Sequence, residues 1–173
     1  MTRLVVMGVS GCGKTSVAEG LAAALGLQAL DADHLHSPEA VARMRAGIAL
    51  TDEDRWPWLD RIGQRLAAPA AAGTAGLVVA CSALRRIYRD RLRAACPGLR
   101  FVFLDGAEAV LAERMAARQG HYMPPSLLAS QLRTLERPGA DEPDVLTVDL
   151  SPPLATVIAH ALQALRAPAP HGA

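Results

Sequence analysis

The sequence predicts an α/β fold, a three-layer sandwich in which a five-stranded parallel sheet lies between two layers of helices. Short apolar segments of strand length alternate with longer segments of helical periodicity, and this alternation is typical of a parallel sheet covered on both faces. A glycine-rich motif, residues 8–15, follows the first of these apolar segments. The chain has 173 residues, which is enough for one such domain with its core but hardly for two.

The first predicted strand, Leu4 to Met7, is apolar and leads directly into the sequence Gly-Val-Ser-Gly-Cys-Gly-Lys-Thr. A glycine, four residues and then Gly-Lys-Ser/Thr is the pattern of a phosphate-binding loop, and apolar residues at helical spacing follow it. In such a loop, backbone N–H groups and the helix N-terminus together bind a polyphosphate. The alternative is a glycine-rich turn with a surface lysine. The pattern predicts nucleotide contacts from Gly8, Val9, Ser10, Gly11, Cys12, Gly13, Lys14, Thr15 and Ser16.

Two carboxylates follow the second predicted strand, residues 27–30. Asp31 and Asp33 point the same way if the strand persists, because side chains alternate along a strand. Ligands of open α/β sheets gather at the carboxyl ends of the strands. We expect Lys14 to reach the β- and γ-phosphates and Thr15 to offer its hydroxyl to Mg²⁺. The two acids are then suited to hold Mg²⁺ or its waters and to accept a proton from a substrate hydroxyl; the alternative is a solvated turn with a capping role.

The next segment begins a helix, with Ser37 as N-cap and Pro38 at the first helical position. His34 and His36 lie just before it. Two histidines two residues apart do not share a helix face, so we do not expect a metal site. A polar contact from one of them to a substrate and a simple surface position remain equally open.

A second helix follows around Pro57, which we expect in the first turn with Asp54 as N-cap. Arg55 then lies at a helix N-terminus beside Trp56 and Trp58. Its guanidinium group matches a carboxylate or a phosphate bidentately, so Arg55 is our candidate substrate anchor. The tryptophans suggest a pocket wall or a small core, with core packing expected for at least one of them.

The third predicted strand spans residues 76–81 and is followed by Ser82 and Arg85, which therefore fall on the ligand side of the sheet. The fourth spans residues 100–105 and leads into a helix. In that helix Arg114 and Arg118 are four residues apart and share a face. In a kinase this region carries arginines over the transferring phosphoryl group on a mobile lid, here about residues 118–127; a solvated helix end is the alternative.

The rest of the chain completes the sheet. A helix continues from residue 127 to 135, a turn covers residues 137–143, the fifth strand spans residues 145–150, and an amphipathic helix covers residues 154–165. We therefore expect a single domain over residues 1–166, with a substrate-binding insertion at about residues 34–72 and a frayed tail at residues 167–173.

Composition excludes several classes of function. The formal net charge is +1, which gives no electrostatic argument for a nucleic-acid or membrane-surface partner. No apolar run approaches the roughly 20 residues of a membrane span, and the early first strand leaves no room for a signal peptide. The 3 cysteines give neither a disulfide framework nor a zinc pattern and suit a reducing cytosol.

The chain resembles the gluconokinases of the P-loop kinase superfamily, of the thermoresistant type. The resemblance covers nearly the whole chain, and the Cys-Ser-Ala-Leu and Gly-His-Tyr-Met sequences are its most specific parts. The segments that carry it are residues 7–15, 31–36, 50–59, 81–90, 120–125 and 135–142. Two departures are visible, because the family more often has serine at position 12 and commonly lysine at position 85. Cys12 is expected to contribute mainly its backbone, with a possible new sensitivity to oxidation.

The resemblance implies ATP-dependent phosphorylation of the 6-hydroxyl of D-gluconate, on a fold related to shikimate and nucleoside monophosphate kinases. It also implies a cytoplasmic protein that is often a homodimer. A kinase for another hydroxy acid such as shikimate, or for a nucleotide, and a regulatory nucleotide-binding domain without turnover are the alternatives.

The mechanism that we expect assigns each candidate residue a role. Lys14 and the loop amides hold the phosphates of ATP, Thr15 with Asp31 holds Mg²⁺, and Asp33 takes the proton of the attacking hydroxyl; the two aspartates could exchange roles. Arg118 closes over the γ-phosphate, and Arg114 packs near the adenine. The residues expected to contact gluconate are Asp33, His36, Arg55, Trp58, Ser82, Arg85 and His121.

Overall fold

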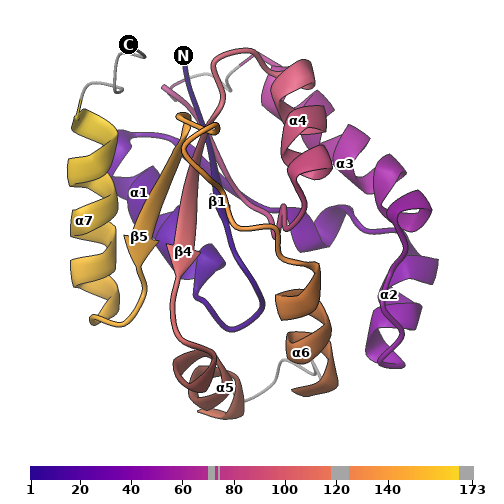
Figure 1. Cartoon of the computed structure of the whole chain (residues 1–173). Helices are drawn as coiled ribbons and strands as arrows, with labels where there is room; N and C mark the ends of the chain where they lie inside the picture. The colour runs from indigo at the N-terminus through magenta and orange to yellow at the C-terminus, as the bar shows by residue number, and fades with distance from the viewer. Residues whose placement is uncertain (70–72, 74, 118–124, 168–173) are drawn as a thin grey trace.

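The computed structural model describes residues 1–69, 73, 75–117 and 125–167 (Figure 1). Strands and helices alternate along these residues, as the sequence predicts. Their order is β1 (Thr2–Met7), α1 (Lys14–Leu25), β2 (Gln28–Asp31), the 3₁₀ helix η1 (Ala32–Leu35), α2 (Pro38–Arg45), α3 (Asp52–Ala67), β3 (Gly76–Ala80), α4 (Arg86–Ala95), β4 (Arg100–Asp105), α5 (Glu108–Ala117), α6 (Pro125–Thr134), β5 (Val145–Asp149) and α7 (Leu154–Arg166).

The five strands form one parallel sheet in the order β2-β3-β1-β4-β5, which confirms the predicted architecture. β1 lies in the middle, and its residue Val5 pairs with Val79 of β3 on one side and Phe101 of β4 on the other. Because all strands run the same way, the loops that follow β1, β2 and β3 meet at one edge of the sheet. These loops carry most of the candidate site residues.

Side chains of the central strand alternate between two cores, which explains the continuous apolar run in its sequence. Leu4 and Val6 pack with α1 and α7 on one face. Val5 and Met7 pack with α3 and α4 on the opposite face. Figure 1 shows the two layers, with α1 and α7 on one side of the strands and α3 and α4 on the other.

The turn at residues 137–143 is fixed to α4 by a buried ion pair. Arg89 is 0% exposed and Glu142 is 3% exposed. The guanidinium group donates from Nε and Nη2 to both carboxylate oxygens, at 2.7 and 2.6 Å, and Arg93 also donates to Glu142. Burial alone would raise the pKa of Glu142, but the hydrogen bonds and charges of the two arginines lower it to about 2.

The start of α3 differs from the prediction, because Thr51 and not Asp54 is the N-cap. The Thr51 hydroxyl accepts from the Asp54 N–H at 3.2 Å, and the Asp54 carboxylate accepts from the Thr51 N–H at 2.8 Å. This reciprocal capping box satisfies two backbone donors, whereas Asp54 alone would satisfy one. Pro57 consequently lies inside the helix and not in its first turn. The predicted cap of α2 is confirmed, since the Ser37 hydroxyl accepts from the Ala40 N–H.

Two predicted segments lie outside the described residues: most of the expected lid, residues 118–124, and the tail after residue 167.

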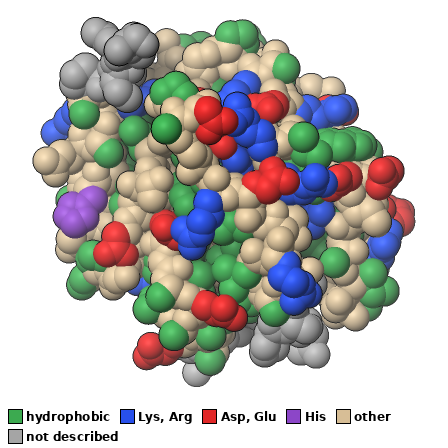
Figure 2. Space-filling model, in the orientation of Figure 1, with side chains coloured by type: hydrophobic (Ala, Val, Ile, Leu, Met, Phe, Trp, Pro, Cys, Tyr) green, Lys and Arg blue, Asp and Glu red, His purple; other side chains and the backbone are tan. Residues whose placement is uncertain are grey.

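Among the helices that the structure describes, none combines the length and the apolarity needed to cross a lipid bilayer. Figure 2 shows basic and acidic side chains next to one another on the face seen in Figure 1.

Candidate active site

The loop between β1 and α1 has the backbone of a phosphate cradle. Gly8, Gly11 and Gly13 have φ angles of 144°, 81° and 88°, which side chains rarely tolerate. A Cβ on Gly11 would lie 2.5 Å from the Cγ of Met115, so α5 packs directly over the loop. Gly13 caps α1 and brings no side chain to its N-terminus, which leaves the positive end of the helix to an anion.

Cys12 lies inside this loop and is only 1% exposed. Its side chain belongs to the core formed with α1 and α7. The sulfur therefore fills space in this core, and the Cys12 N–H donates to the Val9 oxygen within the loop at 3.4 Å. The oxidation sensitivity considered for Cys12 has little structural support, because oxidants reach exposed thiols most readily.

The two residues after Gly13 contact the loop itself and the end of β2. The Lys14 ammonium donates to the backbone oxygen of Val9 at 3.2 Å, so the lysine folds back over the loop. The Thr15 hydroxyl donates to the carboxylate of Asp31 at 2.7 Å. Thr15 lies in α1 and Asp31 at the end of β2, and the sheet brings these two residues together at its carboxyl edge.

Asp31 and Asp33 do not extend one strand, because β2 ends at Asp31 and residues 32–35 form η1. Asp31 caps this 3₁₀ helix: its carboxylate accepts from the Asp33 N–H at 2.9 Å as well as from Thr15. Asp33 is exposed at the start of the turn. The two acids thus have different surroundings, one bound to the phosphate loop and the other facing solvent.

His36 and Trp58 are stacked, with ring centroids 4.3 Å apart and an interplanar angle of 9°. Trp58 is 2% exposed and donates its indole N–H to the Ala32 oxygen at 2.7 Å, so it serves the core, as expected for at least one of the tryptophans. The Nδ1 atom of His36 is buried and has no hydrogen-bond partner within the described residues. Burial lowers the pKa of His36, which favours the neutral imidazole.

A polar network joins α3 to the start of α4. Arg55 donates to the Tyr88 hydroxyl at 3.1 Å, and the Tyr88 hydroxyl donates to the carboxylate of Asp52. Arg85 donates to the same carboxylate and also to Glu136, at 3.2 Å in the second case. Both guanidinium groups lie over the Tyr88 ring, 5.5 and 5.9 Å from its centroid. The network therefore holds Arg55 and Arg85, the two candidate substrate arginines, next to the Tyr88 ring.

Three members of this network were not identified from the sequence: Asp52, Tyr88 and Glu136. The hydrogen bond from Tyr88, and then the neighbouring arginines, lower the pKa of the Asp52 carboxyl, although burial acts against them. Burial and this same hydrogen bond raise the pKa of Tyr88. One signal for them was present in the sequence, which is their position along the chain. Each of the three lies within three residues of a candidate residue or inside a segment that carries the family resemblance.

Ser82 and Arg114 lie beside the loop in different ways. The backbone oxygen of Ser82 accepts from the Gly8 N–H at 3.3 Å, so the end of β3 contacts the start of the phosphate loop. Arg114 donates from Nη2 to the backbone oxygens of Leu150 and Pro152, at 2.6 and 3.4 Å. This ties α5 to the loop between β5 and α7. The strands β1 and β4 lie between β5 and β3, the strand that leads to Ser82. Arg118 and His121 lie outside the described residues.

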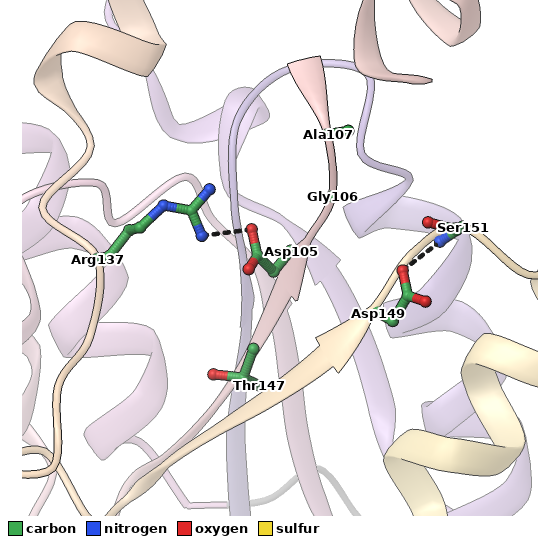
Figure 3. A pocket seen from close by; sticks show the side chains of 7 residues that line it. All are labelled: Asp105, Gly106, Ala107, Arg137, Thr147, Asp149 and Ser151. Carbon is green, nitrogen blue, oxygen red and sulfur yellow. Dashed lines mark hydrogen bonds and ion pairs between the residues drawn. The ribbon is translucent and has the colours of Figure 1, made fainter. Parts of the chain in front are cut away.

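A cavity of about 340 Å³ lies at the carboxyl ends of β4 and β5 (Figure 3). The Arg137 guanidinium donates to Asp105 at 2.6 Å across its mouth, and the Ser151 N–H donates to Asp149 at 2.8 Å. No residue predicted from the sequence lines it. In the part of the chain that the structure describes, no group of three or more His, Cys, Asp or Glu side chains could hold a metal.

Comparisons with known proteins agree with this geometry. A family model described as an AAA domain matches residues 4–138, which include the phosphate loop. The thermoresistant gluconokinase of Escherichia coli (strain K12) is 41% identical over 162 residues, covering 94% of this chain and 92% of the relative. The crystal structure of a gluconokinase from Sinorhizobium meliloti 1021 superposes with a TM-score of 0.86 at 52% identity, covering 95% of this chain and 91% of that one.

A more distant structure shows how widely the fold is shared. Shikimate kinase from Aquifex aeolicus vf5 superposes with a TM-score of 0.59 at 14% identity, over 95% of this chain and 96% of that one. At that identity only the fold is comparable. The similarity at 41 and 52% identity, over nearly the full length of both chains, extends to the family. The chain belongs to the gluconokinase family of P-loop kinases.

Proposed function

We propose that this protein transfers the γ-phosphoryl group of ATP to the 6-hydroxyl of D-gluconate. A bond forms between the hydroxyl oxygen and the γ-phosphorus, the bond from that phosphorus to the bridging oxygen of ADP breaks, and the hydroxyl proton passes to a base. The observation that carries the proposal is the phosphate loop with Thr15 bonded to Asp31, in a chain of the gluconokinase family. Phosphoryl transfer requires positioning and charge neutralisation more than covalent chemistry from the protein.

Thr15 and Asp31 are suited to hold Mg²⁺. Both present hard oxygen atoms, and the hydroxyl and carboxylate are 2.7 Å apart at the N-terminus of α1. Mg²⁺ commonly takes few protein oxygens and completes its shell with water and phosphate oxygens, so a pair is enough. When bound, the ion neutralises charge on the β- and γ-phosphates. Lys14 and the loop amides bind the same phosphates.

We assign the role of base to Asp33 and the metal side to Asp31. Asp31 is engaged by Thr15 and by the Asp33 N–H, whereas Asp33 is exposed on the turn that follows β2. A carboxylate facing the solvent-accessible side can meet a substrate hydroxyl and accept its proton. This distinction favours one of the two assignments that the sequence left open.

Gluconate requires a cationic anchor for its carboxylate, and we assign this to Arg55. Arg85 pairs with the carboxylates of Asp52 and Glu136, while Arg55 donates to the neutral hydroxyl of Tyr88. His36 and Ser82, which follow β2 and β3, complete the polyol contacts, with Arg85 as a further donor. Trp58 is 2% exposed and gives its indole N–H to Ala32, so it supports the site by stacking on the His36 ring. The proposal also keeps three contacts expected from the sequence: Arg118 with the γ-phosphate, His121 with gluconate and Arg114 with the adenine.

We also infer a cytoplasmic homodimer. All three cysteines are free and buried, which is typical of proteins from reducing compartments. The homodimer rests on the family resemblance, because the exposed apolar side chains Ile87 of α4 and Leu154 of α7 lie on opposite faces of the sheet and form no common surface. Sedimentation velocity over a range of protein concentrations tests the dimer, and a single monomeric species would contradict it.

A coupled ADP-release assay with a panel of acceptors tests the function. We expect Mg²⁺-dependent ADP release with D-gluconate, and little with shikimate or nucleoside monophosphates. Turnover with another acceptor alone would reassign the substrate, and ATP binding without any acceptor-dependent release would indicate a regulatory domain. The variant Lys14→Met should abolish transfer to every acceptor, because its phosphate contact is lost.

A further inference from the structure

Two side chains of α3 donate to backbone oxygens of η1, the turn that carries Asp33. The Trp58 indole N–H donates to the Ala32 oxygen at 2.7 Å, and the Arg61 Nε donates to the Leu35 oxygen at 2.8 Å. These oxygens belong to the first and the last residue of η1. Short helices leave their last carbonyl groups without a partner inside the helix, and Arg61 supplies one. The two contacts therefore hold η1 against α3 at both of its ends.

The start of η1 is also bound to the beginning of α1. The Asp31 carboxylate accepts from the Asp33 N–H at 2.9 Å and from the Thr15 hydroxyl at 2.7 Å. The Asp33 oxygen accepts from the His36 N–H at 3.3 Å, so both backbone groups of Asp33 have a partner. The side chain of Asp33 is exposed. The turn that presents this carboxylate thus lies between the nucleotide loop and α3, and α3 determines where it stays.

The surroundings of His36 show that Arg61 lies close to the proposed site. Burial lowers the pKa of His36 most, and the charge of Asp33 acts against it. The charges of Arg55 and Arg61 lower this pKa further. Such effects fall off with distance, so the proposed base, the proposed gluconate anchor and Arg61 lie around one imidazole. The imidazole itself stacks on Trp58.

We propose that Arg61 is a positioning residue, which holds η1 so that the Asp33 carboxylate meets the substrate hydroxyl. This inference rests on the proposed kinase function. Arg55, which we assign to the gluconate carboxylate, precedes Arg61 by six residues on the same helix. Gluconate carries its carboxylate and its 6-hydroxyl at opposite ends of its chain, so the anchor and the base must keep a fixed separation. α3 maintains it, because this helix carries the anchor and, through Arg61, holds the turn of the base.

The variants Arg61→Met and Arg61→Gln test this role. Both remove the charge and keep a similar length, but glutamine can place an N–H donor at the position of Nε, where methionine has a methyl group. We expect Arg61→Met to lower kcat about tenfold, since a displaced base accepts the proton less well. Arg61→Gln should keep kcat within about threefold, because it restores the hydrogen bond. The KM values for ATP and gluconate should change less than about twofold, because Arg61 contacts neither.

The double variant with Asp33→Asn gives a second readout. If Arg61 acts through Asp33, Arg61→Met should lower kcat less than about twofold once the base is removed. A fall of the same size in both backgrounds would indicate a structural role and overturn the proposal, as would equal kcat values for Arg61→Met and Arg61→Gln.

Matched controls are Arg65→Met and Arg65→Gln, the same changes at an exposed position one turn further along α3. Both should turn over like the parent protein. Thermal unfolding of each variant shows whether it is folded. If Arg61→Met is not, Arg61→Glu takes its place, because its carboxylate has a similar length and only accepts hydrogen bonds.

Failure of the kinase function would give a different result. A parent protein that releases no ADP with any acceptor removes the function and the base together. A parent protein that phosphorylates gluconate, with Arg61 variants that behave like the Arg65 controls, removes only the role of Arg61.

Discussion

The Thr15 hydroxyl donates to the Asp31 carboxylate across 2.7 Å, which connects the first helical turn after the phosphate loop to the end of β2. In the proposed function, this hydroxyl and this carboxylate oxygen hold the magnesium ion that binds with ATP. The same carboxylate accepts from the Asp33 N–H at 2.9 Å, whereas Asp33 itself is exposed. Mg²⁺ dependence and proton transfer should therefore respond to different substitutions.

Asp31→Asn should weaken the use of Mg²⁺. Asparagine still accepts a hydrogen bond from Thr15 but lacks the negative charge, so the Mg²⁺ concentration for half-maximal ADP release should rise by about 10- to 100-fold, as for other residues that orient metal ligands. A magnesium titration at saturating ATP and gluconate measures this. Thr15→Ser, which keeps the hydroxyl, serves as the control with a nearly unchanged titration. An unaltered Mg²⁺ requirement in Asp31→Asn would remove Asp31 from the metal site.

Asp33→Asn should lower kcat on the order of 10²-fold while leaving ATP binding intact, because a positioned base contributes about that much to proton transfer. The measurements are steady-state ADP release with gluconate and direct binding of an ATP analogue. The Mg²⁺ titration should keep its midpoint, which distinguishes this variant from Asp31→Asn. Near-normal turnover would show that Asp33 is not the base.

The sequence predicted those parts of the molecule that local residue patterns encode. The glycine positions of the phosphate loop, the five apolar strands and the Ser37 cap are local, and each is confirmed. The cap of α3 was also local but was missed, because Asp54 is a good cap by itself and its pairing with Thr51 outcompetes that arrangement.

Contacts between distant segments could not be predicted from residue spacing. The hydrogen bond between Tyr88 and Asp52 spans 36 positions, and that between Ser10 and Gln131 spans 121. Tyr88 lies in α4 and Gln131 in α6, and nothing in the sequence of either segment marks these residues as part of a site. Their contacts depend on how α3, α4 and α6 pack around the sheet edge, which no single segment specifies.

Tyr88→Phe should raise the KM for gluconate by several-fold with little change in kcat. The substitution removes the hydroxyl that receives the Arg55 hydrogen bond and donates to Asp52, but it keeps the ring under both arginines. Arg55 then loses the contact that orients it, at a cost of about 1 kcal/mol for one hydrogen bond. Steady-state kinetics over a range of gluconate concentrations measures the split. Equal KM values for the parent protein and Tyr88→Phe would show that this network does not contribute to gluconate binding.

Glu142→Gln should lower the free energy of unfolding by about 3 to 5 kcal/mol, because it leaves the buried Arg89 guanidinium without its charged partner. Arg86 and Asp141 form a matched control pair from the same two elements. Asp141 is 70% exposed, so Asp141→Asn should cost less than about 1 kcal/mol. Urea unfolding at neutral pH measures both changes, and similar values for the two variants would contradict a structural role of the buried pair.

The same ion pair should make the protein acid-sensitive. The pKa of Glu142 falls from 4.5 to about 2 on folding, so the unfolded chain takes up a proton more readily than the folded one. The contribution to stability is therefore complete above pH 4.5 and is lost as the pH falls towards 2. Urea midpoints between these pH values should drop more steeply for the parent protein than for Glu142→Gln, which has no carboxyl group to titrate there. Parallel pH profiles for the two proteins would mean that protonation of Glu142 does not control acid unfolding.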